Sequence, residues 1–338
     1  MATLILDRTA ISLSHESGAL IIHENGARRG SVPIKLLRRV VVQSKSLEWT
    51  SGTLAHIVEH GAAVLVLSPR HARQSALVLG PRHNDATIRL AQAEFVTEGT
   101  RRVAWARRLI ALKLRRQEEM LATLEQRRPD RRRALRAGVN VHQRAMSALR
   151  STASIPSIRG VEGAAAAAYF RALGEVFPPA LKFSGRNRRP PRDPVNACLS
   201  LGYTLLHFDA VRAAHVAGLD PLIGFYHLPE FGRESLACDL IEPLRARVDF
   251  FVWRLFADRT LRAENFKHDR GGCLLGKAGR ARFYPDWEAF AGPHRRLLRR
   301  QCQVIARGLN NRGGHLLEQL AACDATEVVD DLAVVRQQ

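Results

Sequence analysis

The hydrophobic pattern of this chain changes its period once, near residue 80, and this change limits the folds that the chain can adopt. Before that point, apolar residues form short runs separated by turn residues, which is typical of strands. From about Ala86, they recur at spacings of three and four residues, which is typical of amphipathic helices. The pattern predicts a multidomain α+β protein with a small β-rich N-terminal domain over residues 1–80, a linker over residues 81–86 and a larger all-α domain over residues 87–338.

Within the first 80 residues, turn chemistry predicts two local features. Asn25 and Gly26 both tolerate positive φ and should join two strands in a tight hairpin. The segment 46–61 reads as one short helix, which Thr50 or Ser51 can cap and Gly61 can end. The expected strands are TLILD, AISLS, ALIIH, VPI, RRVVVQ, AAVLVLS and SALVLG.

The remainder of the chain reads as long helices interrupted by basic segments. The run RRPDRRRALR, residues 127–136, is dense in like charges, and such runs are more often solvated loops than binding sites. The stretch SGRNRRPPRDPVN, residues 184–196, contains too many prolines for a regular helix and should be a loop. Lys267, His268, Arg270, Lys277 and Arg280 form a second basic loop, whose pattern is a weak indication of DNA contact.

The charge balance indicates a polyanionic partner. Lysine and arginine number 52 against 32 aspartate and glutamate, which gives a formal net charge of +20. A genome that favours arginine codons would explain arginine over lysine, but not the net charge. Nucleic acid is the commonest polyanion that such a surface attracts. We therefore expect a nucleic-acid-binding protein.

Cysteine usage and hydropathy indicate the compartment. The five cysteines are scattered and contain no C-x-x-C pair, which argues against a zinc finger or a disulfide framework. The start of the sequence has no evident signal peptide, and no stretch reaches the roughly 18 apolar residues of a membrane helix. We expect a cytoplasmic protein with no membrane partner.

One span of this basic chain is unusually rich in carboxylates. Residues 224–245, GFYHLPEFGRESLACDLIEPLR, contain one histidine and four acidic residues. Asp239 and Glu242 lie three apart, so they share one face if the segment is helical. Two interpretations stay open on spacing alone. Imidazole and carboxylates suit Mg²⁺ or Mn²⁺, or the acidic residues belong to a structural helix and pair with Arg233, Arg245 and Arg247.

A separate carboxylate, Glu162, lies between glycines in the sequence RGVEGAAAAAYF. Small neighbours let another helix or a nucleic-acid backbone approach closely. Glu162 is either a charge favoured by the N-terminal end of a helix dipole or a metal ligand supplied by a second helix. Its position alone does not decide between the two.

Four motifs, in order and spacing, resemble the CRISPR-associated adaptation integrase family, whose members insert new spacers into CRISPR arrays. The match runs from about Arg159 to Phe256, and Leu244 stands where the family motif has phenylalanine. The β-rich start followed by a helical body is also similar to the family's layout. The motifs are GVEGAAAAAYF at 160–170, RNRRPPRDPVNACLSLGYTLL at 186–206, GFYH at 224–227 and SLACDLIEPLR at 235–245.

The resemblance implies a metal site of Glu162, His227 and Asp239 that holds Mg²⁺ or Mn²⁺. Glu242 is assigned a supporting role near the metal or the DNA. Glu230 and Glu234 are then charge balance. His207 and His215, as lone histidines on helices, are expected to be packing or surface residues.

Other motif residues have two open readings each. Asn196, Ser200 and Tyr203 lie at helical spacing, which suits either packing or support of the site. The resemblance places the arginine-rich segment beside the catalytic pocket, where phosphate contact is expected. The expected nucleic-acid-binding residues are Arg186, Arg188, Arg189, Arg192 and Arg245.

The implied activity is that of a metal-dependent DNA endonuclease and strand transferase. The 3′-hydroxyl of a short duplex would attack a phosphodiester at the repeat boundary. The implied partners are double-stranded DNA, a second copy bound through the β-rich domain and a second, smaller adaptation protein. Two alternatives stay open: a stand-alone nuclease that repairs branched DNA, and a non-catalytic DNA-binding scaffold.

Overall fold

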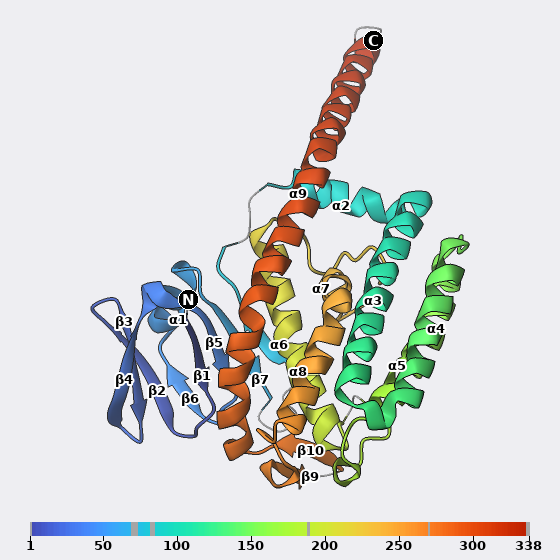
Figure 1. The fold of residues 1–338 in the computed structure, drawn as a ribbon. Coiled ribbons are helices and arrows are strands. Elements are labelled where there is room, and N and C mark those ends of the chain that lie inside the picture. The colour runs from blue at the N-terminus through green and yellow to red at the C-terminus, as the bar shows by residue number, and fades with distance from the viewer. Residues whose placement is uncertain (1, 69–73, 82–84, 188–189, 270, 336–338) are drawn as a thin grey trace.

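The computed structural model describes residues 2–68, 74–81, 85–187, 190–269 and 271–335. It consists of a β-rich part followed by a larger helical part, which confirms the predicted fold class (Figure 1). Arg188, Arg189 and Arg270 lie outside the described residues. Among the described residues, no helix has the length and apolarity needed to cross a membrane.

The β-rich part consists of two four-stranded sheets and one helix. The first sheet has the order β1-β5-β7-β8, in which β1, β5 and β7 are parallel and β8 is antiparallel to β7. The second has the order β4-β3-β2-β6. The strands are β1 (Ala2–Leu6), β2 (Ile11–Glu16), β3 (Ala19–Glu24), β4 (Ala27–Pro33), β5 (Leu37–Val42), β6 (Leu47–Trp49), β7 (Ala63–Leu67) and β8 (Gln74–Val78).

Both turn predictions in this part are confirmed, with one difference. Asn25 and Gly26 join β3 to β4 and have φ values of 54° and 79°, as a tight hairpin requires. The side chain of Thr50 caps α1 (Ser51–Glu59) by accepting a hydrogen bond from the Thr53 amide. The expected helix over 46–61 is shorter at its start because β6 pairs in parallel with β2 there.

The first sheet is buried on both faces, as parallel sheets usually are. Alternate residues of β5 and β7 point in opposite directions. Val40 and Val64 belong to a core shared with the second sheet and α1, whereas Val41 and Leu65 belong to the core of the helical part. The β-rich part is therefore packed directly onto the helices.

Polar contacts reinforce this junction. Arg39 of β5 lies 3.2 Å from Asp209, which also accepts a hydrogen bond of 2.7 Å from Arg295. The Tyr284 hydroxyl donates to Gln43 at 2.7 Å. The buried ion pairs among these contacts add little net stability, because desolvation of the charges offsets their attraction.

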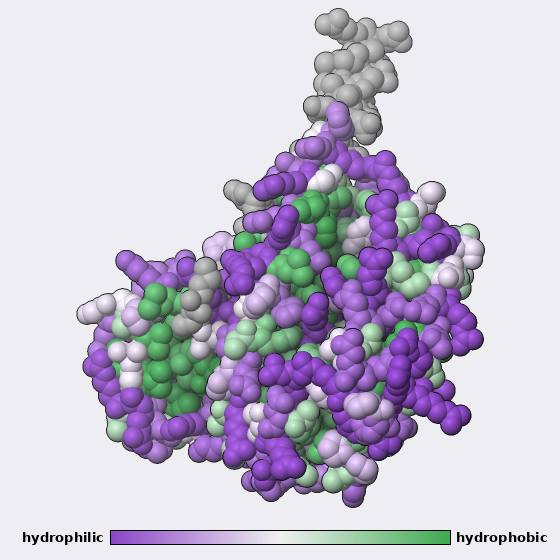
Figure 2. All heavy atoms as spheres, in the orientation of Figure 1, coloured by the Kyte–Doolittle hydropathy of each residue, from purple (hydrophilic) through white to green (hydrophobic). Residues whose placement is uncertain are grey.

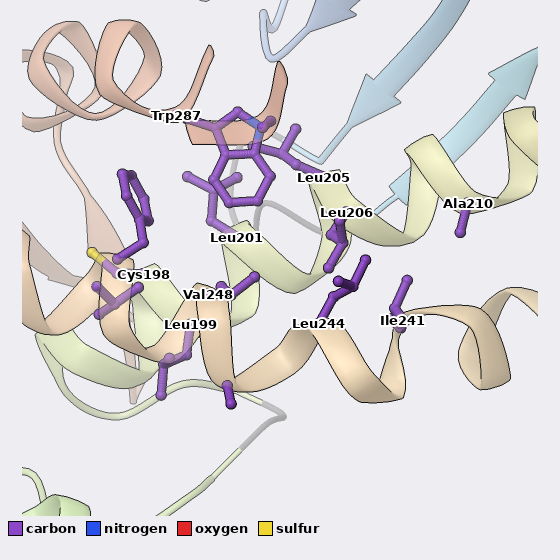
Figure 3. Packing of buried hydrophobic residues seen from close by; sticks show 14 of the residues in the cluster. Cys198, Leu199, Leu201, Leu205, Leu206, Ala210, Ile241, Leu244, Val248 and Trp287 are labelled. Atoms are coloured by element: carbon purple, nitrogen blue, oxygen red, sulfur yellow. The ribbon is translucent and has the colours of Figure 1, made fainter. Parts of the chain in front are cut away.

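The helical part is built around α6 (Pro194–Val216), most of whose residues are buried. Figure 3 shows its side chains beside Val248 of α8 and Trp287 of α9. The helices are α2 (Thr87–Thr97), α3 (Gly99–Arg127), α4 (Arg132–Arg150), α5 (Ile155–Gly174), α6, α7 (Ser235–Ile241), α8 (Arg245–Ala257) and α9 (Lys277–Val335). Short 3₁₀ turns include η4 (Glu242–Leu244).

Two basic segments differ from their predicted form. Residues 266–280 are not one loop, because Phe266–Asp269 (β9) and Gly272–Leu275 (β10) form a hairpin and α9 begins at Lys277. Arg280 pairs with Asp7 at 3.2 Å, so it is a structural contact. The run 127–136 is not one loop either, because α3 ends at Arg127 and α4 begins at Arg132. Arg132 and Arg136 of α4 share the carboxylate of Glu125.

On the visible face, hydrophilic residues predominate over the helical part, and apolar residues gather on the β-rich part and beside α9 (Figure 2).

Candidate metal and nucleic-acid site

A pocket of about 570 Å³ opens beside α5 and the loop that connects α6 to α7. It contains two of the predicted ligands, Glu162 and His227, and two cationic side chains. Its lining residues are Arg159, Glu162, Tyr226, His227, Leu228, Pro229, Glu230 and Arg233.

Glu162 reaches the pocket from the second turn of α5. A reciprocal capping box formed by Ser154 and Ser157 stabilises the start of this helix. The Tyr226 hydroxyl donates to Oε2 of Glu162, and the Lys113 ammonium contacts Oε1. Burial, together with the neighbouring carboxylate, raises the pKa of Tyr226 well above its ordinary value, so the phenol stays a donor.

Asp239 is fully buried, and both of its carboxylate oxygens are engaged. Oδ2 accepts from the amides of Phe225 and Tyr226 at 2.7 and 2.9 Å. Oδ1 accepts from the His227 amide at 3.0 Å and lies 2.7 Å from Nδ1 of the same residue. Asp239 thus holds the loop and the imidazole together, and the bond at Nδ1 leaves Nε2 as the ring nitrogen for a ligand.

Glu242 lies three residues after Asp239, but its carboxylate contacts different partners. α7 ends at Ile241, and η4 turns the Glu242 carboxylate toward α3. There Oε2 lies 2.6 Å from Nζ of Lys113, and Oε1 accepts from Nε of Arg245 at 2.8 Å. Burial opposes the charge of Glu242, but Arg245 and Lys113 hold its pKa well below the usual range, with His227 contributing less. Glu162 and Glu242 therefore converge on one ammonium group.

A stack of aromatic and charged groups supports Arg245. Its guanidinium lies 4.7 Å from the centre of the Tyr203 ring, and that of Arg186 lies 5.4 Å from the same centre. The Tyr203 hydroxyl donates to buried Asp249. Burial raises the pKa of Asp249 to about 6, although hydrogen bonds from Tyr203 and Tyr169 oppose this.

The predicted DNA-contacting arginines are found in three situations. Arg186 donates to Asn196 at 2.8 Å and to Ser200 at 3.1 Å, so these three residues support each other. Arg245 is engaged with Glu242. Arg192 is exposed, with its amide bonded to Asn187. Glu230 pairs with Arg233 within the lining of the pocket, and Glu234 pairs with His207. Nε2 of His215 lies 3.0 Å from the carbonyl oxygen of Gly80.

Sequence reasoning missed Lys113, Arg159 and Tyr226. Lys113 did carry a signal, because it falls on the apolar stripe of α3 between buried Ile110 and Leu114, where a lysine needs a partner. Arg159, one turn before Glu162, stacks over the Tyr226 ring at 5.8 Å and lines the pocket. Tyr226 carries no such sequence signal, because only the fold brings its hydroxyl to Glu162.

The chemistry of Glu162, Glu242 and His227 fits a divalent metal ion. Two carboxylates and one neutral imidazole are the donor set that Mg²⁺ and Mn²⁺ accept. In the described part of the chain, Oε2 of Glu242 is buried and makes no well-aligned hydrogen bond, although an ammonium lies beside it. No three acidic, histidine or cysteine side chains among the described residues stand close enough to hold an ion as they are. Lys113 lies between the two carboxylates instead.

Replacing Asp239 by asparagine should weaken metal binding about 10- to 100-fold, because the amide no longer holds the imidazole in one orientation. Isothermal titration with Mn²⁺ would measure this. Glu264→Gln is the matched control, since Glu264 is exposed in the 3₁₀ turn Ala263–Asn265 and is not among the residues that line the pocket. A loss as complete as that caused by Glu162→Gln would instead mark Asp239 as a direct ligand.

Comparison with known proteins decides the family. The family model described as CRISPR associated protein Cas1 matches residues 4–289. This chain belongs to the Cas1 family. The resemblance inferred from the four motifs is thereby confirmed.

Relatives named as Cas1 endonucleases are similar over most of the chain. A CRISPR-associated endonuclease Cas1 of Thermodesulfovibrio yellowstonii is 38% identical over 310 residues, covering 91% of this Cas1 chain and 96% of the relative. Another, from Thermus thermophilus, is 33% identical, covering 82% and 80%.

Solved structures share the fold at lower identity. A casposase bound to integration product has a TM-score of 0.82 at 21% identity and covers 92% of this chain and 91% of its own. A Cas1 protein from Thermotoga maritima has a TM-score of 0.80 at 18% identity, with coverages of 91% and 97%. A Cas6-RT-Cas1–Cas2 complex has a TM-score of 0.79 at 20% identity, with coverages of 92% and 35%.

Proposed function

We propose that this Cas1 family member is a metal-dependent DNA endonuclease and strand transferase that inserts short DNA segments into a CRISPR array. The observation that carries the proposal is the convergence of Glu162 and Glu242 on a single cation beside His227, at a pocket lined by arginines. Family membership and the names of the relatives support the same activity.

Glu162, His227 and Glu242 would hold the metal ion. This differs from the set implied by the sequence, because the oxygens of Asp239 are engaged with the loop and with Nδ1 of His227. Asp239 is then a positioning residue, and Glu242 takes the ligand role. A bound Mg²⁺ or Mn²⁺ supplies Lewis-acid polarisation of the scissile phosphate.

The chain's own residues would bind and orient the DNA. Arg159 lines the pocket and offers its guanidinium group to phosphate oxygens. Arg233, whose guanidinium is bonded to Glu230, Ser235 and the Leu228 carbonyl, adds positive charge to the lining. Tyr226 keeps Glu162 in place, and Arg245, stacked on Tyr203, does the same for Glu242. In the reaction, the 3′-hydroxyl oxygen of the incoming strand forms a new bond to phosphorus. The bond to the former 3′-oxygen breaks, and that oxygen leaves as a hydroxyl.

Partners are proposed on the same basis. A structure with a similar fold belongs to a complex with Cas2, which supports a smaller adaptation protein as partner here. Another belongs to a Cas1–DNA complex, which supports DNA as ligand. The duplex form of that DNA is part of the proposal. We also propose that the β-rich part joins two copies in a homodimer.

The test is an integration assay with a short duplex bearing 3′-hydroxyl ends, a supercoiled plasmid carrying a repeat array, the purified chain and its Cas2 partner. Joined product that requires Mg²⁺ or Mn²⁺ and a 3′-hydroxyl is expected. Cleavage of branched DNA without joining, in the presence of Cas2, would favour the stand-alone nuclease. Binding with no metal-dependent product would favour the scaffold.

A further inference from the structure

Lys113 occupies a position that a lysine rarely tolerates. It lies in the middle of α3, and its side chain is only 10% exposed. Its neighbours on the helix, Ile110 and Leu114, are fully buried. Transfer of an ammonium group into such surroundings is costly unless the group is paired. The pairing is provided by Glu162 and Glu242 together.

The two carboxylates are arranged around this ammonium in the same way. Each presents one oxygen to Lys113 and turns the other to a fixed donor. The second oxygen of Glu162 accepts from Tyr226, and that of Glu242 accepts from Arg245. Without a cation between them, the two inner oxygens would repel each other in a poorly solvated place. Lys113 therefore holds both carboxylates in the convergent arrangement that a metal ion would need.

We propose that Lys113 is an internal competitor of the divalent ion: its ammonium holds Glu162 and Glu242 together in the metal-free protein and withdraws when the ion enters. This inference rests on the proposed function of the same site and adds how the site is loaded. One cation replaces another, so the gain on metal binding is reduced by the ion pairs that are lost.

Withdrawal leaves the Lys113 ammonium in need of another anion. A DNA phosphate bound in the adjoining pocket is an anion of suitable charge, and the arginines that line the pocket favour its presence. Metal ion and DNA should then bind cooperatively, because each makes the displacement of Lys113 less costly for the other. Metal affinity should be weak without DNA and stronger with it.

Isothermal titration with MnCl₂ tests the inference on the full chain, with and without a short duplex and in the absence of Cas2. Lys113→Met should bind Mn²⁺ about tenfold more tightly than the wild type without DNA, because no ion pair has to be broken. The increase in affinity caused by DNA should shrink in this variant. Lys45→Met, at an exposed position between β5 and β6, is the matched control and should behave as the wild type.

The outcomes separate this inference from the proposed function. If Glu162→Gln loses Mn²⁺ binding but Lys113→Met binds no more tightly than the wild type, the metal site stands and the competitor role is refuted. If Glu162→Gln binds Mn²⁺ normally, both are refuted. Should Lys113→Met not fold, Lys113→Gln keeps a polar side chain of similar reach, and the same tightening is expected.

Discussion

Glu162→Gln and Glu242→Gln are each expected to lower strand transfer and DNA cleavage by about 1,000-fold, because each removes a proposed metal ligand and with it several kcal/mol of transition-state stabilisation. DNA affinity should be unchanged or slightly higher, since each change removes a negative charge near the pocket. Single-turnover assays at saturating DNA would measure the first effect and filter binding the second.

Comparing the variants of Glu242 and Asp239 distinguishes a metal ligand from a residue that positions one. Asp239→Asn should retain activity that rises when Mn²⁺ is increased, since its defect lies in the orientation of His227. Glu242→Gln should not recover at any metal concentration. The reverse ranking would return the ligand role to Asp239. Glu264→Gln, at an exposed position outside the pocket, should retain full activity.

Gly224→Ala is expected to destabilise the fold by about 3 kcal/mol and to reduce activity with it, because a side chain at this position has no space. A Cβ atom would lie 2.5 Å from the carbonyl oxygen of His227 and 2.7 Å from both the carbonyl carbon and the Cβ of Ser235. The loop that carries His227 would have to move away from α7, and the bonds to Asp239 would be strained.

Chemical denaturation monitored by circular dichroism measures this effect. Gly163→Ala is the matched control, because a Cβ on Gly163 meets nothing within 4 Å and a helical alanine is favoured over glycine by about 1 kcal/mol. Equal stability of the wild type and Gly224→Ala would contradict the close packing of this loop.

The sequence predicts the elements whose signals are local. The hairpin at Asn25-Gly26 and the cap at Thr50 depend on the conformational preferences of a few neighbouring residues, and the structure has both. The strand β6 and the hairpin β9–β10 were not foreseen. Each is held by pairing with another strand, and Leu47–Trp49 carries too few residues to display a period of its own.

The site was predictable in its residue types and less so in its geometry. Spacing suggests that Asp239 and Glu242 share one helical face, yet the helix ends at Ile241 and the two carboxylates acquire different partners. Pro243 favours this end, because it has no amide hydrogen with which to continue the helix. Lys113 comes from a helix far away in sequence, and only the packing of α3 against η4 brings it to the carboxylates.

The double burial of the first sheet affects how the chain can be divided. A fragment that ends near residue 81 would expose four apolar side chains to water, those of Val41, Ala63, Leu65 and Leu67. It would also separate Arg39 from Asp209. Exposed apolar strands of this kind promote aggregation. The complementary fragment would expose the surface of α6 and α9 that the sheet now covers. Soluble halves of this protein are therefore best sought by co-expressing the two pieces rather than by preparing either one alone.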